Sequence, residues 1–378
     1  MKKILLRYGE LTLKGKNRIN FIKVLENNLI KKMEGEVIVT FDRAFISFTE
    51  NNIEKLKYIF GLSSFSIVEE IDTSWENIVN RVLNEAKQTN FQSFRIQTKR
   101  SDKKFMYSSQ ETNEKLGAVI LKTFTNSYVQ LKNPDLTIYV EIRANKSFVF
   151  SNYTYTRGGM PVGISGKTLH LMSGGIDSPV AANLMQKRGL IVDFINFITP
   201  PHTDYFTTKK VEDLINEITK YQLKSTLFQI NYTKVMNYLA LVSNQKYKIT
   251  LMRRSFYRIA EAIANKFHYF ALSNGENLAQ VASQTLESIN VIQEVTNLPI
   301  FRPLVSFDKN DTIKIAEQIH TYEISIRRAC ETCELFAPKE PITKPNLQEV
   351  LKLEQELPRL KELETEAIEN VQIFHFHN

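Results

Sequence analysis

Both cysteines of the 378-residue chain lie three positions apart in the stretch RRACETCELF, as Cys330 and Cys333. A C-x-x-C pair suits a disulfide, half of a metal site, or redox and sulfur-carrying chemistry. Two thiols are too few for most iron–sulfur clusters, so a cluster would have to bridge two subunits. A structural zinc would need histidine ligands, and we expect His375 and His377 of the tail FHFHN to be disordered.

A second stretch, HLMSGGIDSPVA at residues 170–181, places glycines and serines between a short apolar run and a helical pattern. Glycines let the backbone turn tightly and present several N–H groups to an anion, and a helix N-terminus adds partial positive charge. Pro179 fits the first helical turn, where its missing N–H would be unpaired anyway. The stretch predicts a phosphate or pyrophosphate cradle, although Ser-Gly-Gly alone could be an ordinary tight turn.

Two other phosphate motifs are excluded. A Walker A loop ending in Gly166-Lys167-Thr168 would need glycine where Pro161 stands, and it would have to follow a strand rather than precede one. No G-x-G-x-x-G occurs at a strand–helix junction.

The elements that must position these residues fall into three stretches. Residues 1–73 predict a small ferredoxin-like α+β unit, and residues 74–164 predict a second α+β stretch whose first helix is capped by Ser74. In the first unit's helix we expect one buried apolar face, made of Ile19, Ile22, Leu25, Leu29 and Ile30. The Gly- and Pro-rich segment RGGMPVGISG is the best linker.

Residues 165–378 alternate strand and helix patterns, which predicts a parallel sheet with helices on both faces. The leucine-rich tail from Asn346 predicts packing helices interrupted at Pro358. The chain is 43% hydrophobic and 24% charged, and no apolar run approaches the ~20 residues of a membrane span. The N-terminus has no signal-peptide pattern, so we expect a cytoplasmic protein, where thiol or metal chemistry is favoured over a structural disulfide.

The net charge of +8 is confined to the first half. Residues 1–165 contain 25 Lys and Arg against 17 Asp and Glu, whereas residues 166–378 contain 24 of each. This asymmetry indicates a polyanion partner, or simply a basic domain. The stretch RIQTKRSDKKF contains the candidate RNA contacts Arg95, Lys99, Arg100, Lys103 and Lys104. The same charges could equally form a solvated face.

Four motifs, SGGIDSPVA, NGENLAQVASQTLESI, SFDK and CELFAPKEPITKP, occur in this order and resemble those of the tRNA 4-thiouridine synthetases. The glycine loop is similar to the PP-loop of ATP pyrophosphatases, which cleave ATP to AMP and pyrophosphate to activate an oxygen for displacement. RIQTKRSDKKF and RGGMPVG resemble parts of that family's THUMP RNA-binding domain. The resemblance spans nearly the whole chain and implies an α/β PP-loop pyrophosphatase domain at 165–378, preceded by ferredoxin-like (1–73) and THUMP (74–164) domains.

The resemblance also implies a site for ATP, with Mg²⁺ near Asp177. The residues that match the family's ATP contacts are Leu171, Met172, Ser173, Gly174, Gly175, Asp177, Ser178, Asn196, Phe197, Arg253, Gly275 and Gln284. Lys309 in SFDK resembles a lysine that neutralises phosphate charge during adenylation. Without this context, Arg253 and Lys309 would be read as surface charges and Gly275 as a plain turn.

For the thiols, the resemblance implies that Cys333 is the catalytic cysteine and that Cys330 resolves it by forming a disulfide. Uracil's carbonyl oxygen is a poor leaving group, so ATP would adenylate it before a cysteine persulfide attacks the carbon. The neighbouring Arg327 and Arg328 could lower the thiol pKa. We expect no C-terminal rhodanese domain of the kind that some family members have, and we therefore expect sulfur to come directly from a pyridoxal-phosphate cysteine desulfurase.

The implied target is uridine 8 of tRNA, with the THUMP domain holding the acceptor end. A homodimer and a secondary part in thiamine thiazole synthesis are further expectations from the family. Two alternatives stay open: a PP-loop RNA-modifying enzyme that adenylates its target without cysteine-borne sulfur, and an RNA-binding protein with an inactive nucleotide loop. The intact Ser173, Asp177 and Ser178 disfavour the second alternative.

Overall fold

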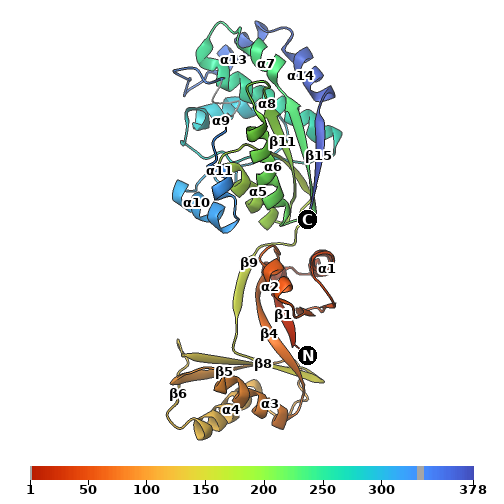
Figure 1. Cartoon of the computed structure of the whole chain (residues 1–378), viewed down its shortest axis with the longest axis vertical. Helices are drawn as coiled ribbons and strands as arrows, with labels where there is room; N and C mark the ends of the chain where they lie inside the picture. Colours follow the sequence, from red (N-terminus) through yellow and green to blue (C-terminus); the bar gives the residue numbers. More distant parts are fainter. Residues whose placement is uncertain (1, 330–335) are drawn as a thin grey trace. The chain divides into compact units, whose positions relative to one another are not determined.

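The chain divides into two units, Met1–Gly158 and Gly159–Asn378, each with its own β-sheet (Figure 1). The structure is a computed structural model, and it describes residues 2–329 and 336–378. Cys330 and Cys333 therefore lie outside the described residues.

In the described part of the first unit, one sheet contains nine strands in the order β2-β3-β1-β4-β8-β7-β5-β6, with β9 also paired to β4. The long strand β4 pairs with β1 and, through Glu69–Asp72, with β8. It thereby joins the strands of the two predicted α+β stretches into one sheet. The strands are β1 (Lys2–Tyr8), β2 (Val37–Val39), β3 (Arg43–Ser47), β4 (Leu62–Asp72), β5 (Ser93–Arg100), β6 (Tyr128–Val129), β7 (Leu136–Ile142), β8 (Lys146–Phe150) and β9 (Thr154–Gly158).

The helical elements of this unit are η1 (Glu10–Leu13), α1 (Arg18–Lys32), α2 (Glu50–Leu56), α3 (Trp75–Lys87) and α4 (Ser109–Thr123). Ser74 caps α3, as predicted, by accepting a hydrogen bond from the Asn77 backbone N–H. The predicted buried face of α1 was too wide, because Ile19 and Ile30 are 55% and 56% exposed. Only the central stripe of that helix, Ile22, Leu25 and Leu29, is buried.

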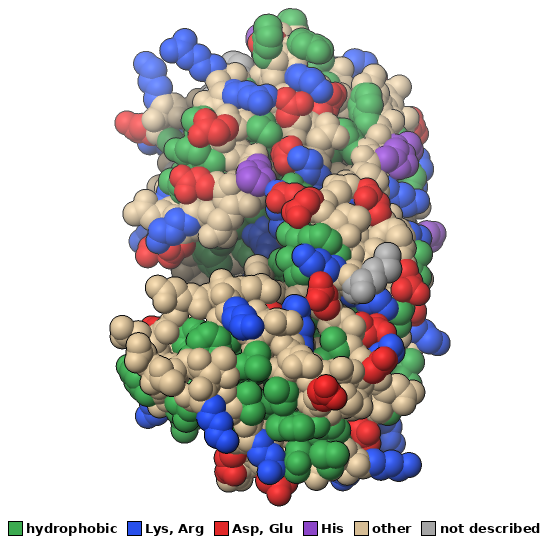
Figure 2. Space-filling view, turned by 60° about the horizontal axis from the view of Figure 1, so that its bottom comes forward, with side chains coloured by type: hydrophobic (Ala, Val, Ile, Leu, Met, Phe, Trp, Pro, Cys, Tyr) green, Lys and Arg blue, Asp and Glu red, His purple; other side chains and the backbone are tan. Residues whose placement is uncertain are grey.

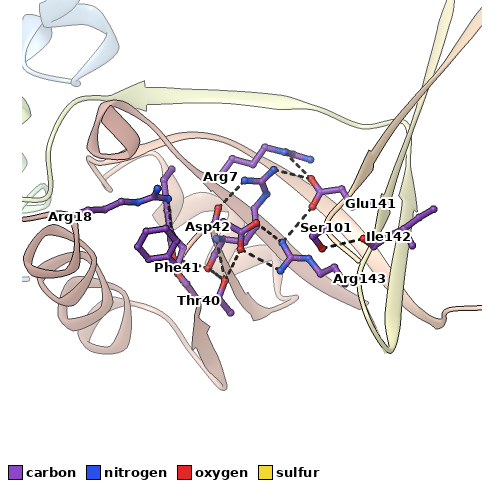
Figure 3. A network of polar contacts seen from close by, with 11 residues as sticks. Arg7, Arg18, Thr40, Phe41, Asp42, Ser101, Glu141, Ile142 and Arg143 are labelled. Carbon is purple, nitrogen blue, oxygen red and sulfur yellow. Dashed lines mark hydrogen bonds and ion pairs between the residues drawn. The ribbon is translucent and has the colours of Figure 1, made fainter. Parts of the chain in front are cut away.

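A cluster of ion pairs ties β1, β3 and β7 together on the sheet (Figure 3). Glu141 accepts Arg43 at 3.2 Å, with Arg7 at 3.8 Å and Arg143 at 3.7 Å. Arg143 also pairs with Asp42 at 3.1 Å. Loss of Glu141 would leave three guanidinium groups facing one another, and breaking a buried pair costs about 3–5 kcal/mol. This cluster fixes the register between the two halves of the first sheet.

The second unit, within its described residues, has a six-stranded sheet in the order β14-β13-β10-β11-β12-β15. All neighbouring strands are parallel except β15, which is antiparallel to β12. The expectation that His375 and His377 are disordered is wrong, because the alternating tail QIFHFH pairs with the edge of β12. The strands are β10 (Lys167–Leu171), β11 (Ile191–Ile198), β12 (Lys224–Asn231), β13 (Leu272–Ser273), β14 (Ile300–Phe301) and β15 (Gln372–His377).

Helices cover both faces of this sheet, as the alternating pattern predicted (Figure 1). One face carries α5 (Asp177–Lys187), α6 (Tyr205–Thr219), α10 (Lys309–Gln318) and α11 (Tyr322–Ser325). The opposite face carries α7 (Thr233–Leu239), η2 (Gln245–Tyr247), α8 (Lys248–Lys266), η3 (Ala282–Gln284), α9 (Leu286–Gln293), α13 (Leu347–Gln355) and α14 (Leu360–Glu369). The tail helices break around Pro358, as predicted, and bury Val350, Leu353 and Leu363 in the core that includes α8.

No helix within residues 2–329 and 336–378 is both long and apolar enough to span a membrane.

Candidate active site

A cavity of about 220 Å³ lies at the carboxyl ends of β10, β11 and β13. The chain runs from β10 to β11 on one side and returns to β13 on the other side of β10. Such a switch in strand order opens a crevice where open α/β sheets bind ligands. All twelve residues predicted to contact ATP line this one cavity.

Several further side chains line the cavity that the sequence did not single out. They are Ile195, Ile198, Thr203, Thr207, Thr208, Val211, Phe256, Asn274 and Glu276. Most of these residues belong to no recognisable sequence motif. The three threonines lie on α6 or just before it, and that helix has no phosphate-binding sequence pattern.

Two serines of the glycine loop, which connects β10 to α5, hydrogen-bond to each other across the loop. The Ser178 hydroxyl accepts a hydrogen bond from the Ser173 N–H at 3.1 Å and donates one to the Ser173 carbonyl at 3.0 Å. Ile176 at the N-cap of α5 provides no side-chain cap. The N-terminal N–H groups of α5 are therefore available to an anion, as a phosphate cradle requires.

Gly275 packs against the first turn of α5. A Cβ atom at this position would lie 2.8 Å from the Asp177 carbonyl carbon and 2.8 Å from the Ser178 nitrogen. Both are backbone atoms, so neither can move aside cheaply. Glycine is needed here because of a close backbone approach, which is a stronger requirement than that of a plain turn.

Asp177 and Lys309, the two candidates from separate motifs, form an ion pair. The Lys309 Nζ lies 2.7 Å from Asp177 Oδ1, and the Gln280 side-chain amide donates to Asp177 Oδ2 at 3.0 Å. Both charged groups are partly exposed, at the N-termini of α10 and α5. The pair places one acid and one base beside the glycine loop.

Buried Glu276 organises the basic groups on the wall of the cavity. Its carboxylate pairs with Arg253 at 2.9 Å and with Arg302 at 2.6 Å, and it accepts a hydrogen bond from the Tyr257 hydroxyl at 3.2 Å. Burial alone would raise the pKa of Glu276, but the two guanidinium groups outweigh it and hold that pKa below its usual range. Glu276 stays ionised and orients Arg253, which also donates to Ser283 at 2.9 Å.

The cavity also offers an aromatic surface and unsatisfied acceptors. The rings of Phe197 and Phe256 stack with centroids 3.9 Å apart. The Asn196 amide donates to the Met172 carbonyl at 2.9 Å. Within the described part of the chain, the buried side-chain oxygens of Asn196 and Gln284 have no hydrogen-bond partner. These oxygens can accept hydrogen bonds from the amino and hydroxyl groups of a nucleoside, because buried acceptors are otherwise satisfied.

His170 lies directly beneath the loop, fully buried in β10. Its Nδ1 is 2.9 Å from the Ser273 hydroxyl, and burial lowers the pKa of His170 to about 3. The imidazole is therefore neutral at ordinary pH and supports the junction of β10 and β13 without contributing charge.

Along β5 and the loop that follows it, the structure separates the five predicted RNA contacts into two groups. The Arg95 guanidinium donates to Thr137 and to the Leu131 carbonyl, and that of Arg100 donates to the carbonyls of Phe105 and Tyr107. The exposed side chains are those of Lys99, Lys103 and Lys104. On the face drawn in Figure 2, basic and acidic side chains are interspersed rather than gathered into one basic area.

Three family models match the chain in succession. A ferredoxin-like domain model (ThiI ferredoxin-like domain) matches residues 3–66, a THUMP domain model matches residues 69–152, and the model described as thiamine biosynthesis protein (ThiI) matches residues 163–358. A probable tRNA sulfurtransferase from Metamycoplasma arthritidis is 57% identical over 98% of both chains.

The chain belongs to the tRNA sulfurtransferase family. It is an enzyme of this class, with a PP-loop α/β domain preceded by ferredoxin-like and THUMP folds. A probable tRNA sulfurtransferase from Acholeplasma laidlawii is 37% identical over 98% of this chain and 92% of the relative.

Solved structures agree with this assignment. The crystal structure of a 4-thiouridine synthetase in complex with RNA and with bound ATP matches at a TM-score of 0.91 and 36% identity, covering 100% of both chains. PH1313 from Pyrococcus horikoshii matches at a TM-score of 0.65 and 21% identity, covering 85% of this chain and 100% of that chain, which establishes similarity of fold.

Proposed function

We propose that this tRNA sulfurtransferase converts uridine 8 of tRNA to 4-thiouridine, using ATP to activate the uracil oxygen. The observation that carries the proposal is the cavity at the switch point, where the open N-terminus of α5 meets the Asp177–Lys309 pair and the wall that contains Arg253. The similar 4-thiouridine synthetase binds ATP and RNA, which supports the same ligands here.

In the first step, uracil O4 attacks the α-phosphorus of ATP, pyrophosphate leaves, and the oxygen becomes adenylated. The glycine loop and the N-terminus of α5 would hold the phosphates, and Lys309 and Arg253 would neutralise charge that develops on them. The buried acceptors of Asn196 and Gln284 and the Phe197 ring would hold adenosine.

The residues present fit a magnesium ion bound together with ATP. No group of three or more His, Cys, Asp or Glu side chains able to hold a metal occurs within residues 2–329 and 336–378. Mg²⁺ in nucleotide sites commonly needs only one or two carboxylates, because phosphates and water complete its shell. Asp177 would provide that carboxylate once Lys309 turns to the phosphates, and the ion would add charge neutralisation.

In the second step, sulfur replaces the activated oxygen. The terminal sulfur of a persulfide on Cys333 attacks C4, and AMP leaves with the original oxygen. The Cys330 thiolate then attacks Cys333 Sγ, which breaks the S–S bond, releases 4-thiouridine and forms the Cys330–Cys333 disulfide. A dithiol reductant must restore the thiols, and a cysteine desulfurase must reload the persulfide, for another turnover.

For tRNA binding, we propose that Lys99, Lys103 and Lys104 contact phosphates. Arg100 shapes the loop that presents them, whereas Arg95 holds the start of β5 against β7. The domain division 1–73, 74–164 and 165–378 is supported by the three matched ranges. A homodimer and a secondary part in thiamine thiazole synthesis rest on the family resemblance, and a cytoplasmic location is the expectation drawn from the sequence.

The test is product analysis by nucleoside mass spectrometry. Unmodified tRNA is incubated with the protein, Mg-ATP, cysteine, a cysteine desulfurase and a dithiol, beside Cys333→Ser and Cys330→Ser samples. We expect 4-thiouridine with the native chain, none with Cys333→Ser, and at most a single turnover with Cys330→Ser. AMP release without any thionucleoside in the native sample would instead indicate a PP-loop enzyme with another nucleophile.

A further inference from the structure

One face of α6 connects the wall of the cavity to the segment that leads into the two cysteines. Thr207 and Val211 line the cavity and lie four residues apart, so they share a helix face. Lys210 lies three residues after Thr207 on that same face and is only 6% exposed. Its ammonium donates a hydrogen bond to the backbone carbonyl of Arg327 at 2.9 Å.

A second contact from α6 holds the side chain of the same residue. The Arg327 guanidinium lies 2.7 Å from Asp213, which lies three residues after Lys210. Arg327 is thus held at its backbone by Lys210 and at its side chain by Asp213. We refer to these three residues as the α6 clamp.

The clamp is linked to the glycine loop through helix α11. Helix α11 ends at Ser325, whose hydroxyl donates to the Gly175 carbonyl at 3.4 Å. Arg327 follows two residues later, and Cys330 three residues after that. Since each residue spans at most about 3.5 Å, the covalent chain keeps Cys330 within roughly 11 Å of Arg327.

Burying a lysine side chain on a helix is energetically unfavourable. Burial of an ammonium is unfavourable unless polar groups compensate for lost water, and Leu or Met would fill this position without that cost. Its contact with the carbonyl gives the ammonium a specific geometric task, because it fixes the point from which the cysteine segment departs.

We propose that Lys210 and Asp213 are positioning residues for sulfur transfer, holding Arg327 so that the cysteine segment starts from the wall of the ATP cavity. The proposal rests on the proposed function, because it assumes that the cysteines deliver sulfur to a base activated in that cavity. Among the residues that the structure describes, neither Lys210 nor Asp213 lines the ATP cavity. Their loss should therefore uncouple the second chemical step from the first.

The decisive variant is Lys210→Met, which keeps an unbranched apolar stem and removes the ammonium. Pyrophosphate, which leaves in the first step, and 4-thiouridine, which forms in the second, are quantified within a single turnover of tRNA, with Mg-ATP, cysteine, a cysteine desulfurase and a dithiol. We expect the rate of pyrophosphate release to stay within about twofold, while the rate of 4-thiouridine formation falls about tenfold. Misplacing reacting groups by about 1 Å can cost even more than this.

Three companion variants sharpen the result. Lys210→Arg keeps a donor at this position and should recover part of the rate of 4-thiouridine formation. Asp213→Asn, at a partly exposed site, should lower that rate about threefold and serves as the test if Lys210→Met does not fold. Lys220→Met is the matched control, because Lys220 lies at the C-terminal end of the same helix and pairs with Glu217 rather than with a residue of the clamp. We expect Lys220→Met to behave as the native chain.

A second readout follows the thiols themselves. Alkylation of Cys330 and Cys333 by iodoacetamide, measured by peptide mass spectrometry, should change in rate in Lys210→Met and not in Lys220→Met. An unchanged rate of 4-thiouridine formation relative to pyrophosphate release in both Lys210→Met and Asp213→Asn would overturn the proposal, as would a parallel fall in pyrophosphate release and 4-thiouridine formation. Absence of 4-thiouridine from the native sample would instead refute the proposed function itself.

Discussion

The cavity of the second unit and the basic strand of the first unit, meaning β5 with the loop after it, are built in different ways. In the cavity, the loop after β10 and the residues after β11 and β13 meet because the strands are parallel neighbours. Along β5 and the loop after it, five cationic side chains are close in sequence, but two arginines already bind backbone carbonyls of their own unit.

This difference shows what decides each kind of site. A cavity at a switch point depends on backbone topology, so residues from distant motifs converge once the strand order is set. A surface charge cluster depends on which side chains have internal acceptors, and local sequence does not reveal these. We therefore expect sharp losses from single substitutions in the cavity and graded losses at the basic strand.

The largest effect should come from the Asp177–Lys309 pair. Asp177→Asn and Lys309→Met should each lower the rate of tRNA-dependent AMP formation about 100-fold or more, since both groups act on developing phosphate charge. Lys314→Met, on the exposed side of α10 and paired with Asp311, is the control and should stay within twofold. A loss below about fivefold in Lys309→Met would remove this lysine from the reaction.

Gly275→Ala tests the close packing of the cavity. The added methyl group meets backbone atoms of α5 at 2.8 Å, and such overpacking costs about 2 kcal/mol. These backbone atoms belong to the helix N-terminus that we propose holds the phosphates, so the Kd for ATP, measured calorimetrically, should rise about 30-fold. Gly117→Ala in α4 is the control, because a Cβ there meets nothing within 4 Å, and it should leave ATP affinity unchanged. Equal ATP affinities in the two variants would contradict the packing argument.

At the basic strand, the triple change of Lys99, Lys103 and Lys104 to Ala should weaken tRNA binding. It should also reduce the slope of log affinity against log salt concentration by about 2 to 3, because three phosphate contacts are lost. Arg100→Ala should instead lower the thermal unfolding temperature and leave the salt slope nearly unchanged, since that guanidinium holds two carbonyls. The reverse pattern would assign the RNA contact to the arginine.

The smallest effect concerns His170 beneath the loop. Because the pKa of this buried histidine is about 3 when folded and about 6.5 when unfolded, protons favour the unfolded chain below pH 6.5. Its contribution to stability is complete above pH 6.5 and falls by about 1.4 kcal/mol by pH 5.5. Denaturant unfolding of the native chain should show this loss, and His170→Asn should lack it. His377→Asn, on the exposed strand β15, should retain the full pH dependence.

The parts of the site that were predictable are those specified by local backbone chemistry. SGGIDS before an apolar helix predicts the loop of the cavity from a few residues, and strand–helix alternation predicts the parallel sheet that opens it. Glu276 could not be recognised in this way, because its burial depends on Arg253 and Arg302, which are distant in sequence. The same is true of Lys210, whose acceptor lies on Arg327.

The fold differs from the sequence prediction where strands far apart in the sequence pair with one another. β4 joins two predicted α+β stretches into one sheet because its residues Glu69–Asp72 pair with β8, a contact that no local pattern encodes. The histidine tail becomes a strand for the same reason, because β12 provides a free edge. On α1, helical periodicity predicted the buried stripe, but not its width, which depends on the surface that the helix covers.

The central claim is that ATP activates the uracil oxygen which sulfur then replaces. The most direct test uses tRNA that carries ¹⁸O at the 4-position of uridine 8, incubated with the native chain, Mg-ATP, cysteine, a desulfurase and a dithiol. We predict that each 4-thiouridine formed is accompanied by one AMP that contains a single ¹⁸O atom. Unlabelled AMP beside 4-thiouridine would contradict the adenylated intermediate and, with it, the role assigned to the cavity.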